Sequence, residues 1–183
     1  MNKLLSSENK YDGRRFKVIQ KVYERHDGVQ LVRDCVEPGN AVIILAINEN
    51  NEAIFIDQYR ETIEEVALEL PAGMIEKDED PKEAARRELE EETGIKAKKI
   101  EYLTSCYPSA GYTNEKIYIY LARDFEYGEQ HLDDTEEILA VKKIHIEDCM
   151  KMILEDKIDH ASVYIAIQTY YYKYHKRRIK WIN

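Results

Sequence analysis

Three glutamates on one predicted helix are the residues best suited to chemistry in this sequence. Glu88 and Glu92 are four positions apart, so they project from one helical face, and Glu91 borders that face. Neighbouring like charges repel each other. Bound Mg²⁺ would compensate, because it prefers oxygen ligands and is commonly held by one or two carboxylates plus substrate phosphates. Taken alone, the glutamates also fit an ordinary solvated acidic face, partly neutralised by Arg86 and Arg87.

The surrounding residues extend these glutamates into a longer pattern of fixed spacing. The pattern runs Gly73, five residues, Glu79, seven residues, Arg87-Glu88-Leu89, one residue, Glu91-Glu92, one residue, Gly94-Ile95. It resembles the Nudix box, G-x5-E-x7-R-E-U-x-E-E-x-G-U with U aliphatic, at every defined position. A charged helix alone does not explain so specific a match, and the sequence is therefore similar to the Nudix hydrolases.

The resemblance implies a fold and a metal site. The fold would be α/β (α+β), a Nudix α/β/α sandwich with a mixed sheet. Independently of the resemblance, the turn signal His26-Asp27-Gly28 between two alternating stretches predicts an N-terminal antiparallel hairpin. A divalent metal, Mg²⁺ with Mn²⁺ as a substitute, would assist hydrolysis of a diphosphate linked to another group. Glu79 and Arg87 match positions that pair to hold the loop. By position, the metal ligands within and beside the box would be the Ala72 carbonyl, Glu88, Glu91 and Glu92.

Segments outside the box indicate the substrate class. Gln58-Tyr59-Arg60 with Glu69-Leu70-Pro71-Ala72-Gly73, and the loop 107–115, resemble stretches of ADP-ribose pyrophosphatases and related nucleoside-diphosphate-sugar hydrolases. Ala110 departs from that loop pattern, which frequently has Pro there. By this resemblance Arg60 would contact a substrate phosphate and Glu115 the terminal ribose or its neighbouring phosphate. Arg33 would contact substrate across a dimer interface. Plain surface roles are the alternatives for Arg60 and Glu115.

The family often places its general base on a loop well after the box. Residues 132–138 are the candidate segment, with Glu136 as first choice, Glu137 as second and Asp134 as third. Glu136 is also expected among the metal ligands, and Glu91 and Glu92 are the box carboxylates expected to take part in catalysis. Each loop carboxylate alone is equally compatible with a solvated position.

Periodicity and turn signals define the elements that must position these residues. Asp80 is suited to cap a helix that begins at Pro81, Glu83 would complete a capping box, and Gly94 would end the helix. The apolar run 41–47 predicts a strand buried on both faces. The predicted strands are 16–23, 29–33, 41–47, 53–60, 66–70, 100–104, 115–121 and 138–144, and the predicted helices are 81–93, 146–155 and 162–176.

Composition limits the classes of partner. Hydrophobic residues make up 44% of the 183 residues, enough for a core, and the net charge of −9 disfavours nucleic acid, which requires a basic stripe. No apolar run is long enough for a membrane span, and residues 1–10 do not form a signal peptide. The three widely spaced cysteines suggest reduced thiols. We therefore expect a cytoplasmic enzyme with a small nucleoside diphosphate substrate.

The organisation and function follow from these points as expectations. Residues 1–38 would form a strand region used for homodimerisation, and residues 39–183 the Nudix hydrolase domain. The leading function is hydrolysis of ADP-ribose to AMP and ribose 5-phosphate. Hydrolysis of other nucleotide sugars, such as GDP-mannose or ADP-glucose, is the enzymatic alternative. A non-catalytic ADP-ribose-binding module is the alternative of another class, although the box has lost no carboxylate.

Overall fold

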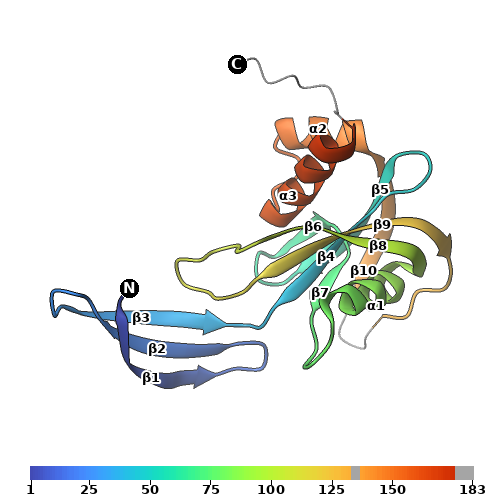
Figure 1. The fold of residues 1–183 in the computed structure, drawn as a ribbon. Helices are drawn as coiled ribbons and strands as arrows, with labels where there is room; N and C mark the ends of the chain where they lie inside the picture. Colours follow the sequence, from blue (N-terminus) through green and yellow to red (C-terminus); the bar gives the residue numbers. More distant parts are fainter. Residues whose placement is uncertain (133–136, 176–183) are drawn as a thin grey trace, which may run out of the picture. The chain divides into compact units, whose positions relative to one another are not determined.

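The computed structural model describes residues 1–132 and 137–175, and the chain forms two compact units (Figure 1). The first unit consists of Met1–Asn40 and Tyr107–Lys116, and the second of Ala41–Cys106 and Ile117–Asn183. The general architecture is the predicted mixture of helices with several sheets, one of them containing a parallel strand pair.

The first unit is an antiparallel sheet in the order β1-β2-β3. Its strands are β1 (Lys3–Asp12), β2 (Lys17–Glu24) and β3 (Gln30–Glu37). The β2–β3 hairpin confirms the predicted turn, with Gly28 at φ 82° and its N–H donating to the Arg25 carbonyl. The sequence does not predict β1, because every residue of that strand is exposed and polar residues dominate it. The Val36 N–H donates to the Tyr112 carbonyl at 2.8 Å, which joins the segment 107–116 to this unit.

The second unit contains two sheets and three α-helices. One sheet has the order β7-β4-β9-β8 and the other β10-β5-β6. The strands are β4 (Ala41–Ala46), β5 (Glu52–Arg60), β6 (Glu65–Glu69), β7 (Ala72–Met74), β8 (Ile95–Cys106), β9 (Ile117–Tyr127) and β10 (Ile138–His145). The helices are α1 (Pro81–Thr93), α2 (Ile146–Leu154) and α3 (Ala161–Tyr170), followed by the π-helical turn η1 (Tyr171–His175).

Strand β4 is buried on both faces, as its continuous apolar run predicts. Ile43, Leu45 and Ile47 contribute to a hydrophobic cluster with residues of α2 and α3. Val42 and Ile44 contribute to a second cluster with residues of α1. Because successive strand residues point to opposite faces, this strand separates two layers of helix, as Figure 1 shows. These layers are the α/β/α arrangement.

Helix α1 has the predicted bounds and the predicted ends. The Asp80 side chain accepts the Lys82 N–H at 2.8 Å, and Gly94 ends the helix at φ 71° with its N–H donating to the Glu90 carbonyl. Within the described part of the chain the predicted capping box is not formed, because the Glu83 carboxylate makes an ion pair with Arg86 at 3.5 Å rather than a hydrogen bond to the Asp80 N–H. Asp80 therefore caps the N-terminus of the helix, and Gly94 ends it, at the positions predicted from the sequence.

Several boundaries differ from the predictions. Pro71-Ala72-Gly73 suggests a turn from its local sequence. Ala72–Met74 instead forms strand β7, because it pairs with β4. Strand β8 extends on both sides of the predicted 100–104, and β9 begins only at Ile117. The last predicted helix is divided into α3 and the π-helical η1. For the strands, pairing between distant segments overrides a local signal.

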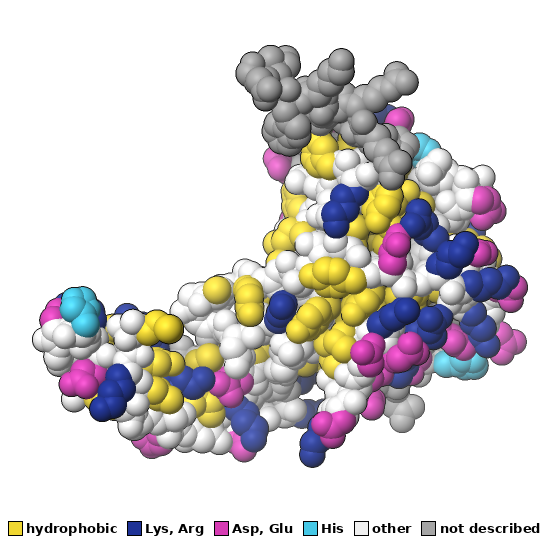
Figure 2. All heavy atoms as spheres, in the orientation of Figure 1, with side chains coloured by type: hydrophobic (Ala, Val, Ile, Leu, Met, Phe, Trp, Pro, Cys, Tyr) yellow, Lys and Arg dark blue, Asp and Glu magenta, His cyan; other side chains and the backbone are white. Residues whose placement is uncertain are grey.

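No helix among the described residues has the length and apolarity needed to cross a bilayer. On the face drawn in Figure 2, Lys and Arg side chains are interspersed with Asp and Glu rather than gathered into one patch.

Candidate active site

The inner face of α1 carries two buried carboxylates. Glu88 is 5% exposed and Glu92 only 1% exposed, beside Ala84, Ala85 and Leu89 of the same face. Charged residues are almost never buried to this degree unless they are paired or bind a metal. The solvated acidic face considered from the sequence therefore does not describe Glu88 and Glu92.

Strand β7 brings the start of the box against these carboxylates. The Ala72 N–H donates to Glu92 Oε2 at 2.9 Å. A Cβ on Gly73 would lie 2.0 to 2.3 Å from the carboxylate atoms of Glu88, so only glycine leaves room for that side chain. The pairing of β7 with β4 holds this approach in place.

Arg87 is the centre of an ion-pair network beside the buried face. Its Nε and Nη2 donate to the two oxygens of Glu79 at 2.9 and 3.0 Å, which is the pairing expected from the box. Its Nη1 donates to Glu88 Oε1 at 2.8 Å and to Glu91 Oε2 at 3.0 Å, and Nη2 also reaches the Met74 carbonyl. The hydrogen bond to Glu79 is the first cause of a raised Arg87 pKa, and the same bond lowers the pKa of Glu79.

The donor set suits a hard divalent cation. Glu88, Glu91 and Glu92 supply carboxylate oxygens, two of them buried, and the gap at Gly73 admits Glu88 closely. Glu88 Oε1 and Glu91 Oε2 accept hydrogen bonds from Arg87 Nη1, so these two oxygens would have to leave Arg87 in order to bind a cation.

Arg60 lies on the second sheet and forms a two-point ion pair. Its Nε and Nη2 donate to Glu69 Oε1 and Oε2 at 2.7 and 2.8 Å. The pKa of Arg60 is raised, first by this hydrogen bond and, among smaller causes, by the negative charges of Glu69, Glu92 and Glu61. Glu69 stands in a motif recognised from the sequence, but its contact with Arg60 was not predicted.

Arg33 and Glu115 belong to the first unit. Arg33 is exposed on β3, and its Nη1 donates to the Val32 carbonyl at 2.8 Å. Glu115 is half-buried, and burial raises the pKa of its carboxyl. Its N–H donates to Thr113 Oγ1 at 3.1 Å.

The candidate base loop lies partly outside the described residues. Asp134 and Glu136 fall within 133–136, which the structure does not describe, and Glu137 is exposed at the start of β10. Hydrogen bonds attach the chain before this loop to the C-terminal end of α1, from Gly128 N to Gly94 O, from His131 N to Glu91 O and from Gln130 Nε2 to Glu92 O. Sequence reasoning did not anticipate this attachment, which supplies partners for the last carbonyls of the helix.

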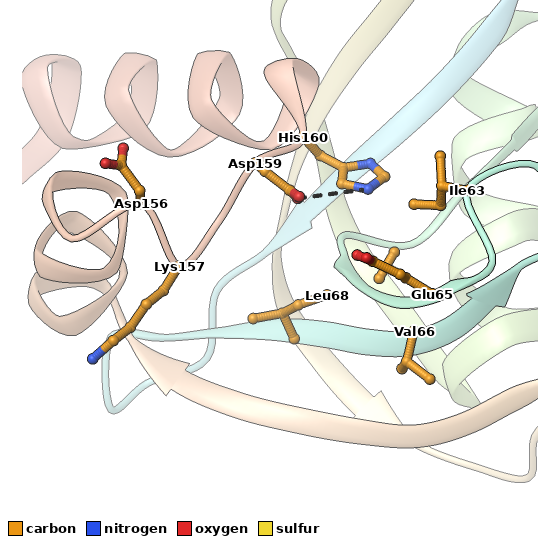
Figure 3. A pocket seen from close by; sticks show the side chains of 9 residues that line it. Ile63, Glu65, Val66, Leu68, Asp156, Lys157, Asp159 and His160 are labelled. Atoms are coloured by element: carbon orange, nitrogen blue, oxygen red, sulfur yellow. Dashed lines mark ion pairs between the residues drawn. The ribbon is translucent and has the colours of Figure 1, made fainter.

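The second unit has one pocket beside α1 and another beside β6. A pocket of about 480 Å³ lies over the outer face of α1 and is lined by Arg86, Arg87 and His131 among others. A smaller pocket of about 140 Å³ lies between β6 and the segment before α3. Figure 3 shows the His160 ring at this pocket, with Asp159 on one side and Ile63 on the other.

Comparison with known proteins agrees with this geometry. The family model of the NUDIX domain matches residues 37–166. An ADP-ribose pyrophosphatase of Bacillus subtilis (strain 168) and a methanol dehydrogenase activator of Bacillus methanolicus are each 32% identical over 167 residues, 91% of this chain and 90% of each relative. A solved structure described as an ADP compounds hydrolase superposes with a TM-score of 0.82 at 27% identity, covering 92% of this chain and 91% of that chain. With Glu88 and Glu92 of its box buried on one face of α1, the chain belongs to the Nudix hydrolase family.

Proposed function

We propose that this Nudix hydrolase cleaves the diphosphate bond of ADP-ribose to give AMP and ribose 5-phosphate, with Mg²⁺ as its metal and Mn²⁺ as a substitute. The observation that carries the proposal is the burial of Glu88 and Glu92 against Gly73 and Ala72. An ADP-ribose pyrophosphatase among the similar proteins supports this choice of substrate.

The proposed metal ligands are Glu88, Glu91, Glu92, the carbonyl of Ala72, and Glu136. A divalent cation supplies neutralisation of the diphosphate oxygens and brings hydroxide within reach at neutral pH. The side chain of Glu92 is already oriented by the Ala72 N–H, which reduces the reorganisation needed on binding.

The remaining roles concern the substrate and the proton. Arg60 binds a phosphate oxygen of the substrate and Glu115 the terminal ribose or its neighbouring phosphate. Glu136, or in second place Glu137, accepts the proton of the attacking water, with Glu91 and Glu92 as the box carboxylates that assist. The raised pKa of Glu115 suits a carboxyl that leaves water when a ligand binds beside it.

We further propose that the chain acts as a cytoplasmic homodimer on a small nucleoside diphosphate, without nucleic acid or membrane partners. Residues 1–38 would provide the dimerisation element and residues 39–183 the hydrolase domain, with Arg33 reaching substrate across the interface. Leu4, Tyr11 and Val32 of the first unit are large apolar side chains at least half exposed, which supports a partner for this sheet.

A product assay tests the substrate. Purified protein is incubated with Mg²⁺ and ADP-ribose, ADP-glucose, GDP-mannose or Ap4A, and the products are separated. The variants are Glu92→Gln, which removes a charge while nearly keeping shape, and Glu90→Gln as a matched control on the same helix, at a residue paired with Lys96. We expect metal-dependent release of AMP from ADP-ribose by the wild type and Glu90→Gln, and its loss in Glu92→Gln.

The other outcomes separate the alternatives. Preferential cleavage of GDP-mannose or ADP-glucose would replace ADP-ribose as substrate and keep the metal site. Binding of ADP-ribose without turnover of any compound would assign the chain to the non-catalytic class.

A further inference from the structure

Arg60 does not form its ion pair with the glutamate directly opposite it in the β5–β6 strand pair. Arg60 is directly opposite Glu65 across the β5–β6 pair, so their side chains leave the sheet on the same face. The guanidinium instead reaches Glu69, which is opposite Ile56 farther along that face. An ordinary surface pair would favour Glu65, because it needs less ordering of a long side chain.

Glu69 is buried where it accepts these bonds. The residue is 7% exposed, whereas the Arg60 side chain is 34% exposed. His160, which lines the small pocket in Figure 3, has its Nδ1 3.8 Å from Glu69 Oε1. A buried carboxylate of this kind is maintained by its partners, and removing one is costly.

The two hydrogen bonds fix the plane of the guanidinium. Arg60 Nε and Nη2 donate hydrogen bonds to Glu69. Because the five N–H donors of a guanidinium have fixed relative positions, these two bonds also fix the remaining donors. The hydrogens on Nη1 then have set directions. Such pre-ordering lowers the entropy lost when the donor binds an anion.

We propose that Glu69 is a positioning residue that holds Arg60 with Nη1 directed at a diphosphate oxygen of the substrate. This inference rests on the proposed function, in which Arg60 binds a substrate phosphate. Glu69 itself does not touch the substrate.

Steady-state kinetics of three substitutions test the inference. Glu69→Gln keeps the size of the side chain, removes its charge and leaves one acceptor for two donors. Glu69→Asp keeps the charge, and Glu65→Gln is the matched control because it alters the carboxylate directly opposite Arg60. Arg60 would bind ground state and transition state alike, so we expect Glu69→Gln to raise KM about tenfold with kcat within about twofold of wild type. Glu69→Asp should recover part of that loss, and Glu65→Gln should match the wild type.

A double-mutant cycle separates positioning from a general structural role. If Glu69 acts through Arg60, Glu69→Gln should raise KM no further in the Arg60→Gln background. An equal rise in KM in both backgrounds, or wild-type KM in Glu69→Gln, would overturn the inference.

An NMR measurement tests whether Glu69 holds the Arg60 guanidinium, and it requires neither an active variant nor the correct substrate. The Arg60 Nε–H signal, assigned by its loss in Arg60→Lys, should be protected from exchange in the wild type and in Glu65→Gln, and exposed in Glu69→Ala, which removes both acceptors. Unchanged protection in Glu69→Ala would overturn the inference. Absence of turnover of all tested nucleoside diphosphates by the wild type would instead refute the proposed function, and the NMR result would remain interpretable.

Discussion

Glu92 Oε2 accepts the main-chain N–H of Ala72 at 2.9 Å, joining the buried face of α1 to the strand that begins the box. The two residues are far apart in sequence, and the bond forms only because β7 pairs with β4. One carboxylate therefore serves both the architecture of the site and its proposed chemistry.

This bond predicts a difference in stability between two substitutions at Glu92. Glu92→Gln retains an oxygen that can accept the Ala72 N–H, whereas Glu92→Ala leaves that buried donor without it. We expect Glu92→Ala to be less stable than Glu92→Gln by about 1–3 kcal/mol in urea unfolding. Equal unfolding free energies would show that the bond contributes nothing.

The close approach at Gly73 predicts loss of metal binding on adding a methyl group. A Cβ there would overlap the Glu88 carboxylate, so Gly73→Ala must displace that side chain. We expect Mn²⁺ affinity, measured by electron paramagnetic resonance, to fall about 10–100-fold. Gly111→Ala is the control, because a Cβ at Gly111 meets nothing within 4 Å. Unchanged Mn²⁺ binding in Gly73→Ala would contradict the assignment of Glu88 as a ligand.

The Glu79–Arg87 pair predicts a pH dependence of stability. Arg87 lowers the pKa of Glu79 in the folded protein, so this contribution is present above the unfolded pKa and is lost as pH falls through the folded one. The difference in Tm between wild type and Glu79→Gln should be largest near neutral pH and shrink toward about pH 3.

The control for that series is Glu83→Gln, at a side chain that is 61% exposed on the same helix. Its effect on Tm should be small throughout. A Glu79→Gln difference that stays constant with pH would mean that the charge of Glu79 is not the stabilising feature.

Substitutions at two glycines with positive φ separate two contributions to the free energy of unfolding, the strain of the backbone conformation and the steric overlap of an added Cβ. Gly28 and Gly94 have φ of 82° and 71°, but only at Gly94 would a Cβ meet a neighbour, the Gly128 carbonyl oxygen at 2.5 Å. Gly28→Ala should cost about 1–2 kcal/mol of unfolding free energy, and Gly94→Ala clearly more. Equal costs in chemical denaturation would show that segment 128–131 yields without penalty.

Local signals predicted the fold where they act within a few residues. Asp80, Pro81 and Gly94 define α1 because caps and helix termini depend on nearby backbone groups. Strand β7 could not be predicted, because three residues beside a proline become a strand only by pairing with distant β4. Strand β1 carries too little apolar alternation to be recognised.

The same limit applies to the site. The box spacing identified Glu88 and Glu92, because helical periodicity alone places them on one face. It did not identify Glu69 or Gln130, whose contacts with Arg60 and with the end of α1 depend on the arrangement of separate elements. Residue type and spacing thus predict what a helix presents, while partners from other strands and loops require the structure.

Strand β4 has a consequence for how this chain reaches its native state. It pairs in parallel with β9, which is distant in sequence, and its alternate residues contribute to both hydrophobic clusters. Neither cluster can be completed until β4 and β9 pair, which closes the long segment of chain between them. The conformational entropy of that segment is lost before the new contacts compensate for it. The two helical layers should therefore consolidate together in one late, cooperative folding step, and neither should persist as an independent intermediate.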